Sequence, residues 1–304
     1  MEFFYIRTLR PTFTDQSMKN RIPFIDFAKA FAILGIALYH YLLPLGGNRI
    51  FDLVISFVGT GIHLFFFLSG YGLGMSTYTS APDFYRRRFS KVLIPYFVFV
   101  TFIFLLNLLL PLYPENGWRD YLAHIFLYKM FSSQAIGSFG FHLWFLSTLV
   151  QLYLVFPVLI YVMKKWNPVY AVWVALTISV GYILWVVQSG HAFDRPWNSF
   201  FLTYLWEFVL GAFLGMRREA RIFTLSLPVY AVFWVAGLAG MAVFTLKLGQ
   251  TGRLLNDLPA FVAITSFTLL AFHLLGKWKI TRRIQDFFTR SGSLSYEFYL
   301  GHYV

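Results

Sequence analysis

The sequence predicts an all-α polytopic membrane protein, a transmembrane helix bundle of about nine to ten spans with a cytoplasmic N-terminus. Of its 304 residues, 58% are hydrophobic and 12% are charged, which is about half the charge of an ordinary soluble domain. Apolar runs of about 18 residues or more recur along the chain, and a run of that length can cross a bilayer as a helix. Basic clusters separate these runs, and their order along the chain orients the bundle.

Eight complete spans follow from the apolar runs. We expect them at 23–45, 53–76, 92–112, 142–163, 168–189, 199–216, 227–247 and 258–276. A further span begins near residue 294, but the chain ends before the roughly 20 residues that a crossing requires. The segment 121–131 is too short to cross and favours a position at the membrane interface.

Basic residues concentrate in alternate loops, while the intervening loops carry few and mixed charges. The basic loops hold Lys19 and Arg21; Arg86, Arg87, Arg88 and Lys91; Lys164 and Lys165; Arg217, Arg218 and Arg221; and Lys277, Lys279, Arg282 and Arg283. An excess of Lys and Arg marks the cytoplasmic side. We therefore expect a cytoplasmic juxtamembrane segment at 1–20 and one membrane domain at 21–304, incomplete at its C-terminal end.

Charge and cysteine content exclude several classes of function. The net charge is +12, but it is spread over short clusters and forms no single basic patch, which argues against a nucleic-acid partner. The chain contains no cysteine, so disulfides, thiolate metal ligands and a cysteine nucleophile are excluded. Scattered histidines do not make a metal site, and we predict no metal ligands.

The first span carries three ionisable residues: Asp26, Lys29 and His40. Lys29 and His40 are about three helical turns apart, so their side chains lie nearly in line, separated by roughly 16 Å along the axis. Ionisable residues within a span are costly in lipid and generally serve a function. Histidine can act as a general base near pH 7, and we predict His40 as a catalytic residue, with Asp26 as a second. Asp26 is too far along the helix to contact His40, so a carboxylate that orients His40 has to come from another span.

Arg88 and Lys91 precede the third span on the predicted cytoplasmic side. The positive-inside bias alone accounts for such a cluster. The two residues are three apart and share a helix face, where they can bind phosphate oxygens. Lys29, near the inner end of the first span, can add to this site. We predict that Lys29, Arg88 and Lys91 bind the phosphates of a cytoplasmic cofactor.

The fourth and sixth spans supply the remaining candidates. His142 and Trp144 open the fourth span on the predicted outer side. An aromatic belt accounts for the tryptophan, whereas His142 beside it could hydrogen-bond a sugar. Glu207 is a carboxylate inside the sixth span and therefore a functional candidate. We predict that His142, Trp144 and Glu207 bind the substrate.

Five short motifs, in this order along the chain, resemble the acyltransferase-3 family of integral-membrane acyltransferases, which modify cell-surface and exported glycans. They are Asp26…Lys29-x10-His40, Phe66-Phe67-Leu68-Ser69-Gly70, Arg88-x-x-Lys91…Pro95, His142-Leu143-Trp144 and Ser295-Tyr296…Tyr299-Leu300-x-His302. The resemblance covers essentially 21–304. Members of the family often have arginine at the position of Lys91. Lysine keeps the charge there but loses bidentate phosphate binding.

The resemblance implies a membrane O-acyltransferase. It would move an acyl group, typically acetyl, from cytoplasmic acyl-CoA to a hydroxyl of a cell-surface or lipid-linked carbohydrate. It implies His40 as the essential histidine and Arg88 and Lys91 as the basic pair. The partners are then acyl-CoA as co-substrate, the glycan acceptor and the lipid bilayer, with no bound cofactor. The expected location is the bacterial inner or plasma membrane, where the chain would be multi-pass.

Two other interpretations use the same residues. A secondary transporter or flippase for a glycan or lipid-linked sugar could use the intramembrane charges, although the repeated halves typical of transporters are not evident in the sequence. An inactive scaffold subunit would tolerate the loss of His40.

Overall fold

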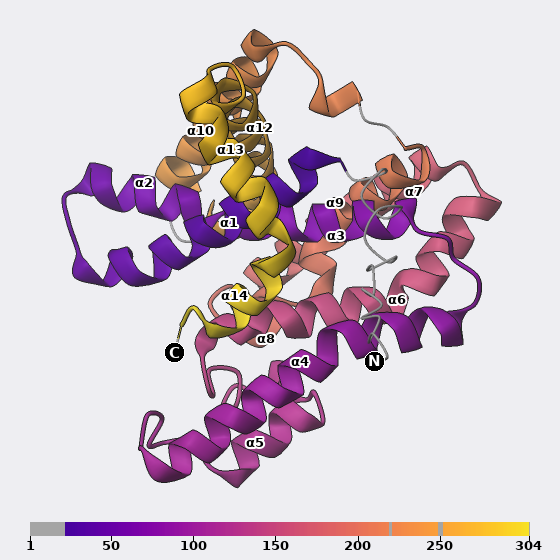
Figure 1. The fold of residues 1–304 in the computed structure, drawn as a ribbon. Coiled ribbons are helices and arrows are strands. Elements are labelled where there is room, and N and C mark those ends of the chain that lie inside the picture. The colour runs from indigo at the N-terminus through magenta and orange to yellow at the C-terminus, as the bar shows by residue number, and fades with distance from the viewer. Residues whose placement is uncertain (1–21, 219–220, 249–251, 304) are drawn as a thin grey trace, which may run out of the picture.

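The computed structural model describes residues 22–218, 221–248 and 252–303, and within these ranges the regular structure is helical, without strands (Figure 1). Eight helical segments in the described part are long and apolar enough to cross a membrane. They are Pro23–Leu45, Arg49–Met75, Ala81–Leu109, Phe141–Lys165, Pro168–Gln188, Arg195–Met216, Leu227–Leu248 and Asp257–Leu275. The predicted all-α polytopic class is confirmed, and the chain is a multi-pass membrane protein.

In the described part of the chain, nine long helices make up most of these segments. They are α1 (Pro23–Leu42), α2 (Arg49–Gly59), α3 (Gly61–Met75), α4 (Ala81–Leu109), α6 (Trp144–Lys165), α7 (Pro168–Gln188), α9 (Phe201–Met216), α10 (Leu227–Leu248) and α12 (Asp257–Leu275). The shorter helices are α5 (Trp118–Ile125), α8 (Arg195–Asn198), α11 (Gly252–Leu255), α13 (Lys279–Ser291) and α14 (Ser295–Gly301). Short 3-10 turns occupy Leu43–Leu45, Lys129–Phe131, Phe141–Leu143, Arg221–Phe223 and Gly292–Leu294.

Consecutive spans run in opposite directions, so the connections divide between two ends of the bundle. The α3–α4 connection lies at one end, which we call the inner end because the basic clusters predict it to be cytoplasmic. The segments that precede α6, α9 and α12 lie at the other end, which we call the outer end. The orientation of these ends in a membrane stays a prediction.

The second span is broken in the middle, whereas the prediction was one continuous span over 53–76. Helix α2 ends at Gly59 and α3 begins at Gly61. The hydroxyl of Thr60 donates a hydrogen bond to the carbonyl oxygen of Phe57, at 2.6 Å. Such a local bond competes with the regular helical ladder.

The third span begins earlier than the predicted residue 92. Helix α4 starts at Ala81, because the hydroxyl of Ser80 accepts a hydrogen bond from the backbone N–H of Asp83. A proline in the first turn also suits a helix start. The basic cluster around Arg88 therefore lies on the first turns of α4 and not in the loop before it, which agrees with the helix face predicted for Arg88 and Lys91.

Helices α3 and α9 lie side by side near the centre of the bundle (Figure 1). Gly70 and Gly74 of α3 face the backbone of α9, while Gly211 and Gly215 of α9 face the backbone of α3. At each position an added Cβ would lie under 3.0 Å from a main-chain atom. Small residues four apart let two helix backbones approach closely, so these glycines fix the spacing of α3 and α9.

The C-terminal segment packs between α1 and α4. Gly292 lies against the backbone of Asp26, with no room for a side chain. The hydroxyl of Tyr296 donates a hydrogen bond to the carbonyl oxygen of Val92, at 2.6 Å. Helix α14 continues from this contact and carries His302 to the outer end.

Candidate active site

Three histidines from distant parts of the chain converge at the outer end of the bundle. His40 lies in the last turn of α1, His142 in the 3-10 turn before α6, and His302 directly after α14. The ring centroids of His40 and His302 are 5.5 Å apart, and those of His142 and His302 are 4.8 Å apart. The Tyr303 ring contacts both His40 and His142. We call His40, His142 and His302 the histidine cluster.

Backbone contacts fix two of the three rings. Nε2 of His142 lies 3.1 Å from the carbonyl oxygen of Leu300, and Nδ1 of His302 lies 2.8 Å from that of Tyr299. Because a carbonyl oxygen only accepts, each of these nitrogens carries the proton and donates. Nδ1 of His142 and Nε2 of His302 are buried and have no partner among the described residues. Each neutral ring therefore holds a basic nitrogen available for proton transfer.

The surroundings of His40 are aromatic. Among the described residues, the rings in contact with it are those of Tyr39, His302 and Tyr303. Asp26, the other predicted catalytic residue, lies in the first turn of α1, roughly 21 Å away along the helix axis. The structure thus groups His40 with the predicted substrate residue His142 and does not group it with Asp26.

A basic pocket lies at the inner end, where α4 begins. Its volume is about 300 Å³, and it is lined by Ser76, Thr77, Phe84, Arg87, Arg88 and Lys91. Arg87 forms an ion pair with Asp83 at 2.8 Å. Arg88 is half-buried and Lys91 is exposed, so the predicted basic pair lines one pocket. This inner pocket can accept phosphate oxygens.

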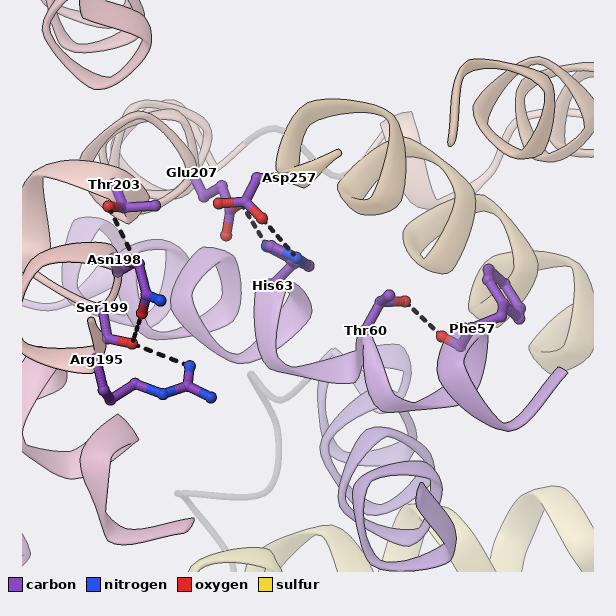
Figure 2. A network of polar contacts seen from close by, with 9 residues as sticks. All are labelled: Phe57, Thr60, His63, Arg195, Asn198, Ser199, Thr203, Glu207 and Asp257. Atoms are coloured by element: carbon purple, nitrogen blue, oxygen red, sulfur yellow. Dashed lines mark hydrogen bonds and ion pairs between the residues drawn. The ribbon is translucent and has the colours of Figure 1, made fainter. Parts of the chain in front are cut away.

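A second polar group connects three spans below the outer surface. Nδ1 of His63 on α3 lies 2.8 Å from Oε1 of Glu207 on α9. Its Nε2 lies 3.7 Å from Oδ1 of Asp257 at the start of α12. All three side chains converge in Figure 2, and Glu207 is completely buried. Glu207, predicted to bind substrate, contacts His63. We call His63, Glu207 and Asp257 the carboxylate–histidine triad.

A large cavity opens beside this triad at the outer end. Its volume is about 860 Å³. Its lining is formed by Ser133, Ile136, Phe141, Ala192, Phe193, Asp194, Arg195, Pro196, Trp197, Asn198, Tyr204, Leu254 and Asp257. The guanidinium of Arg195 lies 4.7 Å from the ring centroid of Phe141 and 4.8 Å from that of Trp144. Trp144, another predicted substrate residue, therefore supports a cation that lines this outer cavity.

The outer cavity and the histidine cluster are neighbours. Phe141 lines the cavity, and the next residue in the chain is His142. The outer cavity therefore lies beside the turn that carries His142.

A buried network lies in the segment between α4 and α6, where the prediction was an interfacial element. The hydroxyl of Tyr96 donates to Nδ1 of His124 at 2.7 Å, and Nε2 of His124 donates to Ser138. Nζ of Lys129 donates to the carbonyl oxygen of Ser138 at 3.2 Å. Burial lowers the pKa of Lys129 to about 7, and burial with the nearby lysine lowers the pKa of His124. The hydrogen bond between Tyr96 and His124 anchors this segment to α4.

His63, Arg195, Asp257 and His302 belong to these sites but were absent from the predicted set. His302 belongs to the last motif of the sequence, and the position of that motif on the chain gives no sign of its contact with His40. Arg195 and Asp257 were counted only as charges of outer loops. Both lie next to the start of a span, where a charged side chain can point towards the interior of the bundle.

The comparisons with known proteins agree with the motifs. The acyltransferase-3 family model, described as an acyltransferase domain, matches residues 22–304. A Bacillus subtilis (strain 168) protein named as the membrane-bound acyltransferase YfiQ is 25% identical over 251 residues, which are 78% of this chain and 66% of that protein. Nodulation protein 10 of Rhizobium leguminosarum bv. viciae is 25% identical over 291 residues, covering 85% of this chain and 74% of that protein.

No solved structure matches the chain significantly. The family model nevertheless spans all the residues of the histidine cluster, the inner pocket and the outer cavity. The chain therefore belongs to the acyltransferase-3 family and is a membrane acyltransferase.

Proposed function

We propose that this protein is an O-acyltransferase that moves an acyl group, typically acetyl, from acyl-CoA to a hydroxyl of a cell-surface or lipid-linked carbohydrate. The observation that carries the proposal is the convergence of His40, His142 and His302 beside the outer cavity. The inner pocket at the opposite end of the bundle supports a donor that enters from the cytoplasm.

The inner pocket holds the phosphates of the donor. Arg88 and Lys91 line it, and Arg presents the geometry that suits phosphate oxygens. Lys29 lies on α1, roughly 16 Å before His40 along the axis, and adds positive charge on the route between the two. The acyl end of the donor then projects along α1 towards the histidine cluster. Asp26 lies at the inner end of the same helix, so it is near the donor and far from His40.

His40 performs the transfer by one of two routes. As a general base it takes the proton of the acceptor hydroxyl. The hydroxyl oxygen then attacks the thioester carbonyl, the C–S bond breaks, and the sulfur leaves with the proton as CoA thiol. As a nucleophile, His40 first forms an acyl-imidazole with release of CoA, and the hydroxyl then takes the acyl group. His142 and His302 offer basic nitrogens that carry the proton in either route.

An assay in reconstituted vesicles separates this function from transport. Vesicles are supplied with radiolabelled acetyl-CoA and a sugar acceptor, and the sugar is recovered and analysed by mass spectrometry. The proposal predicts acetylated sugar that requires acetyl-CoA. Movement of unmodified sugar across the bilayer, without any acetylated product, would establish a transporter instead.

Mass spectrometry of the surface glycans with and without this protein identifies the acceptor and the transferred group. The proposal predicts the loss of one ester modification, with the mass of its acyl group, in cells that lack the protein. An unchanged glycan profile would count against a cell-surface acceptor.

A further inference from the structure

The outer cavity is lined by one hydrogen-bond acceptor and one hydrogen-bond donor, and neighbouring side chains hold both in position. Asp257 and Arg195 both line it. The volume of about 860 Å³ falls within the range of small-molecule sites, about 300–1,000 Å³. Sites of this kind owe their specificity to a few placed polar groups. The two residues define what the cavity can recognise.

Asp257 is fixed by the carboxylate–histidine triad. Its residue surface is 9% exposed, and its Oδ1 lies 3.7 Å from Nε2 of His63. His63 is in turn held by Glu207 at 2.8 Å. Oδ2 of Asp257 is buried and has no hydrogen-bond partner among the described residues. A buried carboxylate oxygen without a donor is unfavourable, and a ligand hydroxyl that donates to it removes this cost.

Arg195 is held in position by two aromatic rings and a serine hydroxyl. Its guanidinium lies against the rings of Phe141 and Trp144, and its Nη1 donates to the hydroxyl of Ser199 at 3.1 Å. Figure 2 shows Arg195 and Ser199 beside the triad. A guanidinium has five N–H donors, so Arg195 can donate to a ligand as well as to Ser199.

The charges of the cavity favour an uncharged ligand. Among the described residues, the lining has one cation, Arg195, and two carboxylates, Asp194 and Asp257. An anionic ligand would meet both carboxylates, and a cationic ligand would meet Arg195. A hydroxyl both donates and accepts, so two neighbouring hydroxyls can satisfy Asp257 and Arg195 together. The chemical class that fits is a neutral polyhydroxy compound, that is, a carbohydrate.

We propose that the outer cavity is the acceptor site, in which Asp257 accepts a hydrogen bond from one carbohydrate hydroxyl and Arg195 donates to the oxygen of its neighbour. His63 and Glu207 are positioning residues that hold the Asp257 carboxylate. The inference rests on the proposed acyl transfer and names the site of its acceptor. The bound sugar then lies next to His142 and the rest of the histidine cluster.

The first test separates acceptor binding from donor binding. Methyl β-glucoside and methyl N-acetyl-β-glucosaminide serve as acceptor probes, and CoA release from acetyl-CoA is followed with a thiol reagent. The chain has no cysteine of its own, so the protein adds no signal. Asp257→Asn should raise the KM for the glycoside about tenfold, because a hydrogen bond to a charged group is replaced by a weaker one. Acetyl-CoA binding, measured by equilibrium dialysis, should not change.

Glu115→Gln is the control for this test. Glu115 is an exposed carboxylate on the outer end, outside the cavity lining, and its loss should leave the glycoside KM unchanged. An unchanged glycoside KM in Asp257→Asn, with the wild-type protein active, would overturn the inference alone. A wild-type protein that does not bind acetyl-CoA would overturn the proposed function instead.

A second test needs no change in the triad. Ser133 lines the cavity, and Ser133→Cys introduces the only thiol of the chain. A membrane-impermeant maleimide should label this cysteine from the outer side, and the glycosides should slow the labelling. Failure of both glycosides to slow labelling and to stimulate CoA release would show that the cavity is not a carbohydrate site.

Discussion

Replacement of Gly70 by alanine tests whether the close contact between α3 and α9 holds the carboxylate–histidine triad together. An added Cβ at Gly70 would come closer than 3.0 Å to the carbonyl carbon and oxygen of Phe208 on α9, and would lie 3.1 Å from the backbone nitrogen of Ala212. Backbone atoms cannot rotate away, so the two helices must separate. His63 lies two turns before Gly70 on the same helix, and its 2.8 Å contact with Glu207 spans this interface.

The size of the effect follows from a comparison with Gly72, two residues further along α3. An added Cβ at Gly72 meets nothing within 4 Å. Both substitutions change glycine to alanine in one helix, so the difference in helix propensity, about 1 kcal/mol, cancels between them. What remains is the cost of overpacking, typically about 1–3 kcal/mol. Gly70→Ala should therefore be less stable than Gly72→Ala by that amount.

The assay is thermal unfolding of the two purified variants in the same detergent, together with acyl transfer. At roughly 2–4 °C per kcal/mol, the unfolding midpoint of Gly70→Ala should lie several degrees below that of Gly72→Ala, and its activity should fall. Equal midpoints for the two variants would refute the inference that backbone contact at Gly70 fixes the spacing of α3 and α9.

Three further predictions follow from the sites. Arg88→Ala should weaken acetyl-CoA binding about 10- to 150-fold, because one charge-assisted contact of about 1.5–3 kcal/mol is lost. Arg86→Ala is the control, since the Arg86 side chain is 80% exposed and lies outside the inner pocket, and it should leave binding unchanged. Equilibrium dialysis measures both affinities, and equal values would remove Arg88 from the donor site. Lys129→Met should raise the stability of the protein, by at most about 5 kcal/mol, because the folded state lowers the pKa of Lys129 from 10.5 to about 7. Between these two values the unfolded chain binds the extra proton, so wild-type stability rises with pH, and the advantage of Lys129→Met should be larger at pH 6 than at pH 9; thermal unfolding at both values checks this, and an advantage that grows with pH would contradict it. His302→Gln should lower acyl transfer while acetyl-CoA binding is kept, and full activity would exclude His302 from the proton path.

The fold class was predictable because a helix that crosses a bilayer needs a long run of apolar residues, and such runs are easily recognised in a sequence. Long apolar runs separated by basic clusters gave the eight spans within a few residues at most ends. Two details were not predictable from hydropathy alone. The break at Thr60 depends on one side-chain hydrogen bond. The early start of α4 depends on the cap at Ser80. The first turns of this helix carry charged residues, and hydropathy alone assigns such residues to a loop.

The site was predictable only where the candidate residues shared a helix. Arg88 and Lys91 are three apart on α4, and the structure places both on one pocket. The meeting of His40 with His142 and His302 joins segments more than 100 residues apart, and no local spacing encodes such contacts. Glu207 was a candidate because it is an ionisable residue in a span, but the identity of its partner His63 depends on how the glycines of α3 and α9 interlock.

The role of His40 in acyl transfer is tested most directly by His40→Gln, with His273→Gln as the matched control. His273 is bonded to the carbonyl oxygen of Phe223 at 2.8 Å and lies outside the histidine cluster, and glutamine can keep this hydrogen bond. Transfer of radiolabelled acetyl groups from acetyl-CoA to acceptor is measured for both variants after each has been shown to be folded and inserted. His40→Gln should lose at least about a hundredfold in rate, and His273→Gln should retain activity. Wild-type transfer by His40→Gln would contradict the assignment of the histidine cluster as the catalytic site.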